Sequence, residues 1–157
     1  MKQNRPVLEY RLWKGNETYT PLYFYEHIEL EQILARRECE FFIKEGVTYK
    51  QVSSAKEDHL FVIYVEKYEE NPPEPEDPAS RGSLKLEIRE LNSIKGHPLI
   101  ESVYLDDHLD VLSYIGSSFT YFLNKEWERD SAELDEDRKV YVLYVTATGY
   151  EWESEED

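Results

Sequence analysis

The chain has 157 residues, enough for one ordinary domain or two very small ones. Its 13 Tyr, 6 Phe and 3 Trp are more aromatic side chains than a disordered segment carries, so we expect a folded protein with a real core. The net charge of −16 excludes ordinary binding to the phosphate backbone of nucleic acids, which needs clustered Lys and Arg. A charged partner should instead be a protein with a basic surface.

The amino-acid sequence contains no recognisable signal for secretion or membrane insertion. Cys39 is the single cysteine, which excludes a disulfide scaffold. The first residues form no apolar signal-peptide core, and no apolar run approaches the roughly 18 residues of a membrane span. We therefore expect a cytoplasmic protein that does not enter a membrane.

The first elements in chain order are two strands and a helix. Apolar and polar residues alternate over 8–13, which predicts a half-buried strand, and aromatic, β-favouring residues over 19–25 predict its partner. The apolar spacing then changes over 26–37 to that of a short helix. Acids at its start and Arg36-Arg37 at its end suit the helix dipole.

The rest of the first half is strand-like. Residues 40–44 and 47–52 flank a turn at Glu45-Gly46 and form either two strands or one bulged strand. The segment 60–65 is apolar at every position, which predicts a central strand covered on both faces.

A proline-rich segment separates this half from the next. Residues 71–78 hold four prolines and three acids, which predicts an extended and stiff linker over 71–83.

The pattern before the linker returns after it. Residues 140–145 match 60–65 at an offset of 80, and 121–123 match 41–43 at the same offset. Leu86-Glu87-Ile88-Arg89 resembles Leu8-Glu9-Tyr10-Arg11, and an acid-His pair ends in His108 as it does in His27. Asp107, in the second of these pairs, is suited to cap a helix.

Repetition at a nearly fixed spacing predicts repeated structural units. We expect an α+β fold of two tandem ββαββ units, over 1–70 and 84–150, mainly antiparallel, with one short helix each and an acidic tail over 151–157. Because each unit would be small, we expect the halves to pack as a pseudo-two-fold pair. Two independent units on a stiff linker are the alternative.

Motifs for catalysis or cofactor binding are missing from the pattern, so we expect no enzyme activity and no cofactor or metal. His27 and His108 are the best candidates for a ligand site between the units, although their neighbouring acids lie on other faces of a helix. Cys39 lies between two acids, which oppose thiolate formation and predict an unreactive thiol.

Acidity combined with aromatic residues is the unusual property of the chain. Acids cluster over 66–77, 126–137 and 151–157, and the total charge is sufficient for DNA mimicry. We therefore expect a non-enzymatic inhibitor or adaptor, for example a phage-type antagonist of a host-defence or nucleic-acid enzyme. A ligand-binding protein or enzyme with a site between the repeats is the alternative, and exposed strand edges would also permit a homo-oligomer. The predicted partner-binding residues are Trp127, Glu128, Asp135, Glu136, Asp137, Trp152, Glu153 and Glu155.

Overall fold

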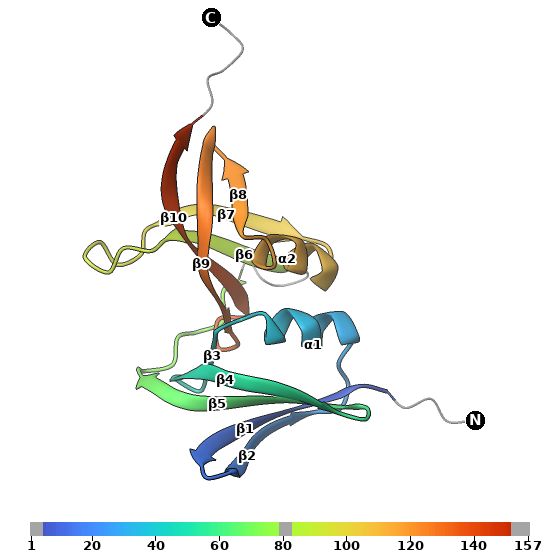
Figure 1. Cartoon of the computed structure of the whole chain (residues 1–157). Helices are drawn as coiled ribbons and strands as arrows, with labels where there is room; N and C mark the ends of the chain where they lie inside the picture. The colour runs from blue at the N-terminus through green and yellow to red at the C-terminus, as the bar shows by residue number, and fades with distance from the viewer. Residues whose placement is uncertain (1–4, 79–82, 152–157) are drawn as a thin grey trace, which may run out of the picture.

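The computed structural model describes residues 5–78 and 83–151 of the chain. It is a mixed α and β structure, mostly sheet, with two short helices (Figure 1). The N-terminal half contains β1 (Val7–Gly15), β2 (Thr18–Tyr25), α1 (Leu30–Arg37), β3 (Phe41–Lys44), β4 (Val47–Glu57) and β5 (Leu60–Glu70). The C-terminal half contains β6 (Leu84–Glu90), β7 (Leu99–Leu105), α2 (His108–Ile115), β8 (Phe119–Phe122), β9 (Lys125–Asp135) and β10 (Val140–Glu151).

The two helices differ at their starts. The helix predicted over 26–37 begins only at Leu30, because Glu29 has extended backbone angles (φ −82°, ψ 152°). The helix of the second half begins after Asp107, whose carboxylate accepts the backbone N–H of Asp110 at 2.9 Å. The N-cap predicted at Asp107 is therefore confirmed.

The turn at Glu45-Gly46 separates two strands. Glu45 and Gly46 both have positive φ angles, 53° and 79°, which close a tight hairpin between β3 and β4. The alternative of one bulged strand is wrong. The described residues of each half therefore form five strands, in the order ββαβββ instead of the predicted ββαββ.

The strands of the two halves follow the same spatial order. It is β2-β1-β5-β4-β3 in the first half, and β7-β6-β10-β9 with β8 beside β9 in the second. In each half the first strand pairs in parallel with the last, β1 with β5 and β6 with β10, and the other pairs within a half are antiparallel.

Irregularities in the strand pairing recur at a constant spacing. The register of β1 against β2 shifts between Tyr10 and Arg11. The register of β6 against β7 shifts between Ile88 and Arg89, 78 residues later. A bulge of this kind is a local feature of the chain, so its recurrence gives an independent measure of which residues are equivalent.

Hydrogen bonds after each helix repeat with the same spacing. The N–H of Gln51 donates to the carbonyl of Glu40 at 2.8 Å, and the N–H of Arg129 donates to that of Ser118 at 2.8 Å, again 78 residues later. The offset of 78 also relates the first residues of α1 and α2.

Only the last strands are offset by 80, because the turn before them differs in length. Two residues, 58–59, connect β4 with β5, whereas four, 136–139, connect β9 with β10. Two of the matches made from sequence, 121–123 with 41–43 and His108 with His27, are therefore out of register, whereas 140–145 with 60–65 and Leu86–Arg89 with Leu8–Arg11 are in register. Residue Phe41 of β3 corresponds to Phe119, not to Tyr121, and His27 does not correspond to His108.

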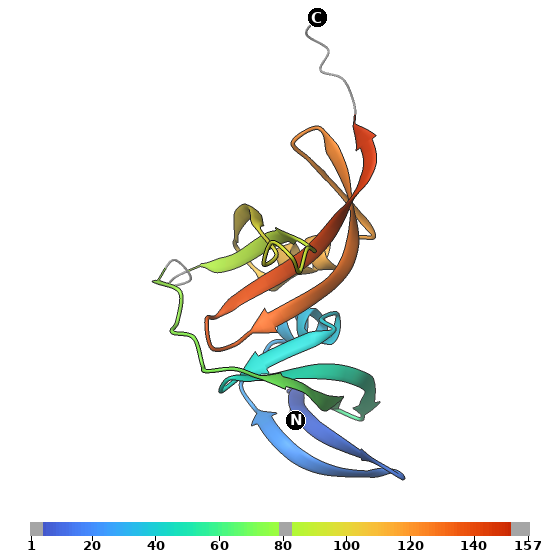
Figure 2. The ribbon, with the colours of Figure 1, turned by 90° about the vertical axis from the view of Figure 1, so that its left-hand side faces the viewer.

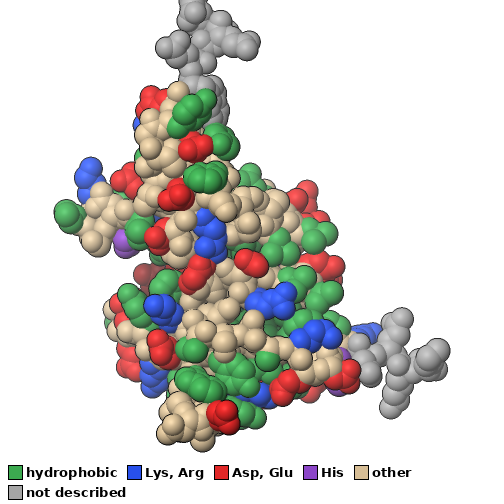
Figure 3. All heavy atoms as spheres, in the orientation of Figure 1, with side chains coloured by type: hydrophobic (Ala, Val, Ile, Leu, Met, Phe, Trp, Pro, Cys, Tyr) green, Lys and Arg blue, Asp and Glu red, His purple; other side chains and the backbone are tan. Residues whose placement is uncertain are grey.

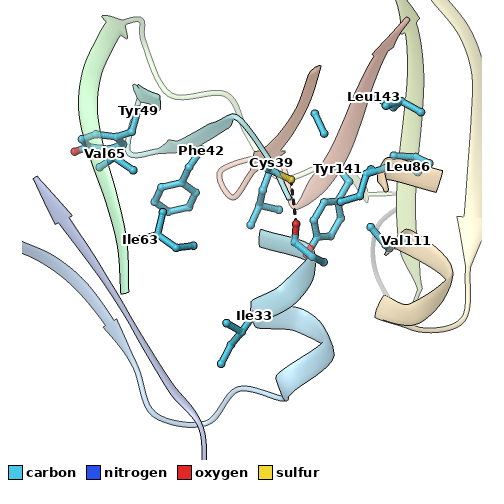
Figure 4. Packing of buried hydrophobic residues seen from close by; sticks show 14 of the residues in the cluster. Ile33, Cys39, Phe42, Tyr49, Ile63, Val65, Leu86, Val111, Tyr141 and Leu143 are labelled. Atoms are coloured by element: carbon cyan, nitrogen blue, oxygen red, sulfur yellow. Dashed lines mark hydrogen bonds between the residues drawn. The ribbon is translucent and has the colours of Figure 1, made fainter. Parts of the chain in front are cut away.

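The halves join edge to edge and share one core. Strand β3 pairs in parallel with the end of β9, which makes one ten-stranded sheet, and α1 packs on α2. Figure 4 shows Cys39 and Tyr141 between core residues of the first half and core residues of the second. Two independent units are thus ruled out by the shared core.

The junction lacks the predicted two-fold symmetry. Such symmetry would require β8 to pair with β4 as β3 pairs with β9, and the described strands make no such pair. The contact is heterologous, since each half uses a different surface.

The described part of the linker, residues 71–78, is extended and is held by backbone hydrogen bonds at Asn71 and Asp77 (Figure 2). The N–H of Asn71 donates to the carbonyl of Gly46 at 2.8 Å, and the N–H of Asp77 donates to that of Arg138 at 3.0 Å. A Cβ atom on Gly46 would lie 2.2 Å from the Asn71 carbonyl oxygen, so this close approach requires glycine. Neither described helix has the length and apolar character needed to cross a membrane.

Candidate functional site

The predicted acidic triplet lies at the end of β9 and in the turn that follows, and Glu136 and Asp137 bind the other half. Glu136 forms ion pairs with Arg36, at 3.1 Å, and with Lys44, and it accepts the Tyr25 hydroxyl at 2.7 Å. Its backbone N–H donates to Ile43 at 2.9 Å. Burial alone would raise the pKa of Glu136, but the hydrogen bonds from Lys44 and Tyr25 and the charge of Arg36 outweigh burial and lower it.

The flanking acids are engaged as well. Asp137 accepts the backbone N–H groups of Glu45 at 2.7 Å and Gly46 at 2.9 Å. Asp135 is buried and accepts the N–H of Arg138 at 3.1 Å, and burial raises its pKa. Asp135, Glu136 and Asp137 are therefore engaged in contacts within the chain, and their binding to a partner stays a prediction. We call this turn, residues 136–139, the clamp turn.

The remaining predicted partner-binding residues lie in different places. Trp127 is only 6% exposed and stacks on Phe122 with ring centroids 5.3 Å apart, so it is a core residue and its prediction as a surface contact is wrong. Glu128 is exposed on β9. The predicted residues Trp152, Glu153 and Glu155 lie outside the described residues.

The two histidines of the alternative site differ in their surroundings. His27 is exposed and lines a shallow cavity of about 460 Å³ before α1, which His108 does not line. His108 packs edge-on against Tyr141, with ring centroids 5.8 Å apart. Burial, helped by the positive charge of Arg36, lowers the pKa of His108. Among the residues described, no group of three or more His, Cys, Asp or Glu could hold a metal ion.

A groove of about 840 Å³ does lie at the junction of the halves, but other residues form it. Its walls are the linker, the ends of β3 and β9, and the loop between β6 and β7. We call it the junction groove. Its acidic residues are Glu69, Glu74, Glu133, Asp135 and Asp137, and its cationic ones are Arg89 and Arg138.

Glu133 is the acid in the junction groove with the most unusual chemistry. Its carboxylate accepts the Tyr144 hydroxyl at a long 3.4 Å. Burial, together with the negative charge of Asp135, raises the pKa of Glu133 to about 7. The nearby Arg138 is bound elsewhere, because it contacts Glu87 at 2.5 Å. A cation that entered the groove would therefore meet a carboxylate that lacks a strong partner.

A second surface, on the C-terminal half, exposes aromatic side chains beside acids. Tyr104 of β7 is 55% exposed, and Phe119 and Tyr121 of β8 are 44% and 53% exposed. Across the ladder from Phe119 and Tyr121 stand Glu128 and Glu126. We call Tyr104, Phe119 and Tyr121 the aromatic face. Figure 3 shows green apolar side chains next to red acidic ones at this end of the molecule.

The aromatic face borders a second groove of about 460 Å³, between β7 and β8. It is lined by Tyr104 and Tyr121 at its mouth, by Ile88 and Tyr114 further in, and by the acid Glu101. We call it the β7–β8 groove. The alternation of Phe119 and Tyr121 was visible in the sequence, but a period of two does not say which face of a strand meets solvent.

Comparisons with protein-family models, with curated proteins and with solved structures found no match to this chain.

Proposed function

We propose that this protein is a non-enzymatic inhibitor or adaptor that binds a basic protein through its C-terminal half. The observation that carries the proposal is the aromatic face with its flanking acids. Exposed Tyr and Phe that gather on one surface are typical of protein interfaces, where aromatic side chains supply much of the binding energy. Glu126 and Glu128 beside them suit a partner of opposite charge.

Charge acts over a longer range than these contacts. A net charge of −16 attracts a basic surface before contact and speeds association at low salt. Enzymes that bind nucleic acids carry such surfaces, and these enzymes, including those that act in host defence, are the partner class we propose. DNA mimicry is a less well supported way of binding such an enzyme, because acids such as Glu87 and Glu136 form ion pairs within the chain.

Affinity capture with matched variants tests the proposal. The immobilised chain should retain a basic protein from a lysate of its source, with an association rate that falls as salt rises. Tyr104→Ser with Tyr121→Ser should abolish retention, whereas Phe24→Ser, 52% exposed on β2 of the first half, should not change it. Equal retention by both variants, or insensitivity to salt, contradicts the proposal.

Glu133 favours a second candidate function, the binding of a small cation in the junction groove. A guanidinium or ammonium group beside Glu133 would lower the raised pKa of that carboxylate. The side-chain carboxyl signal of Glu133, followed by NMR against pH, should shift its midpoint downwards when arginine amide is added. An unchanged midpoint at saturating arginine amide excludes this candidate.

We also infer that the chain arose by duplication of a ββαβββ unit. Support comes from the shared strand order and from the pairing irregularities 78 residues apart. The two extra residues of the clamp turn are then a change specific to the second copy. They created the contact by which one copy binds the other.

A further inference from the structure

The β7–β8 groove occupies the same place in the second half that the clamp turn's binding site occupies in the first. The side chains that hold Glu136 are Tyr25, Arg36 and Lys44. The residues 78 positions after them are Val103, Tyr114 and Phe122, and all three line the β7–β8 groove. In the first half this site is occupied by Glu136 of the clamp turn, and in the second half the equivalent site is open.

The strand beside the groove is open in the same way. Strand β3 pairs with β4 on one edge and with the end of β9 on the other. Its counterpart β8 pairs with β9 alone among the described strands. The unpaired edge of β8 thus offers backbone N–H and C=O groups to a further strand.

The chemistry of the open site differs from that of the filled one. Arg36 and Lys44, which bind an acid, are replaced by Tyr114 and Phe122, and Tyr23 is replaced by Glu101. Two cations are lost and one carboxylate is gained. Aromatic rings beside a carboxylate bind a Lys or Arg side chain through cation–π and ionic attraction.

We propose that the edge of β8 receives a β-strand of the protein partner, and that the turn after this strand places a Lys or Arg side chain in the β7–β8 groove. The inference rests on the proposed function, because it names how the basic partner would bind. The first half supplies the template: strand β9 pairs with β3, and the residue after it enters the binding site.

A second copy of this chain is a poorer occupant. The counterpart of the inserted strand and turn in the first half is the end of β4 with residues 58–59. That turn is two residues shorter and carries the exposed Asp58, which Glu101 would repel. Both copies would also bear the full net charge of −16.

The β9–β10 hairpin that carries the clamp turn provides a peptide probe for the β7–β8 groove. A disulfide-cyclised peptide of residues 129–142 contains the strand and turn that bind β3. We would titrate it into the labelled full-length chain in two forms, one native and one with Glu136→Arg and Asp137→Lys, and follow backbone NMR signals. The charge-reversed form should shift the signals of β8 and bind about tenfold more tightly than the native form.

Variants of the full chain locate the site. Glu101→Gln should weaken binding of the charge-reversed peptide by about threefold to tenfold, whereas Glu66→Gln, an exposed acid on β5, should leave it unchanged. Equal affinity for both peptides, or shifts that miss β8, overturn the inference. Concentration-dependent dimerisation with shifts at β8 would also overturn it, because a second copy would then be the occupant.

The result separates this inference from the proposed function. If capture of a basic protein depends on Tyr104 and Tyr121 while the peptide misses β8, the protein-binding function stands and strand insertion fails. If capture of a basic protein does not depend on Tyr104 and Tyr121 and the peptide also misses β8, the protein-binding function and strand insertion both fail.

Discussion

The binding site of the clamp turn and the β7–β8 groove lie at equivalent positions of the two halves, but they are lined by different side chains and only the first is occupied. In the first half the place is lined by Tyr25, Arg36 and Lys44 and is filled by Glu136 of the same chain. In the second half it is lined by Val103, Tyr114 and Phe122 and is open to solvent. The comparison indicates that a shared backbone fixes where a strand can be added, while three side chains decide what is accepted.

We call the binding site of the clamp turn in the first half the closed site. Among substitutions near it, we expect the largest loss of stability at Gly46, where the backbone leaves no space for a side chain. Gly46→Ala forces a positive φ on a side-chain-bearing residue and pushes its Cβ against Asn71, so we expect it to lower the free energy of unfolding by about 3 kcal/mol. Gly15→Ala is a matched control, because Gly15 has a similar φ of +80° and nothing within 4 Å of its Cβ position. It should lower the free energy of unfolding by only about 1 kcal/mol. Urea unfolding measures both, and equal losses would mean that the linker does not press on this turn.

The cations of the closed site come next in expected effect. Arg36→Met keeps the packing volume but removes the partner of Glu136, so we expect a loss of about 2 to 3 kcal/mol in the free energy of unfolding. Arg37→Met, one position along the same helix and only partly buried, should cost less than about 0.5 kcal/mol. A small effect of Arg36→Met would show that the other contacts of the clamp turn, with Tyr25, Lys44 and the backbone of β3 and its hairpin, hold it without Arg36.

The pH dependence of stability should reveal the uncompensated acid of the junction groove. The folded-state pKa of Glu133 is raised to about 7, so its protonated form favours folding at low pH. That contribution is complete below the unfolded-state pKa and is lost as pH rises through about 7. Glu133→Gln should therefore raise the free energy of unfolding by about 2 kcal/mol at pH 8 and change it little at pH 4. Urea unfolding at both pH values checks this, and an equal gain at both would assign the effect to packing.

The smallest predicted effect compares equivalent turns. Asp137→Ala removes the acceptor for two backbone N–H groups and should lower the free energy of unfolding by about 1 kcal/mol. Asp58→Ala, in the shorter turn of the first half, changes an exposed side chain and should be nearly neutral. Equal losses of stability for Asp137→Ala and Asp58→Ala would mean that the hydrogen bonds of Asp137 do not stabilise the clamp turn.

Local patterns predicted most of the elements. Period-two alternation located β1, the resemblance of Leu86–Arg89 to Leu8–Arg11 pointed to β6, and the apolar run at 60–65 located the central strand β5. The repeated apolar character of 140–145 pointed to equivalent strands. These signals depend on residues that are neighbours in sequence, which is why one chain was enough to see them.

Contacts between distant segments could not be predicted in the same way. Whether Glu136 meets solvent or a cation depends on Arg36, 100 residues away, and on the edge pairing of β3 with β9. Trp127 looked like an interface anchor because a single aromatic residue does not reveal which face of its strand is buried. The match of 121–123 to 41–43 was wrong because it used the offset of 80, which holds only after the two extra residues of the clamp turn. The match of His108 to His27 was wrong because it rested on a local acid-His pair alone.

The most direct test of the central claim exchanges the contents of the two sites. The double variant Glu101→Tyr with Tyr114→Arg gives the β7–β8 groove the Tyr23 and Arg36 of the closed site, and it spares Phe122, which stacks on Trp127. Once unfolding curves show that the variant folds, its affinity for both 129–142 peptides is measured. We predict that it prefers the native acidic peptide, with signals shifting along β8, whereas the parent prefers the charge-reversed form. An unchanged preference for the charge-reversed peptide would contradict the equivalence of the two sites.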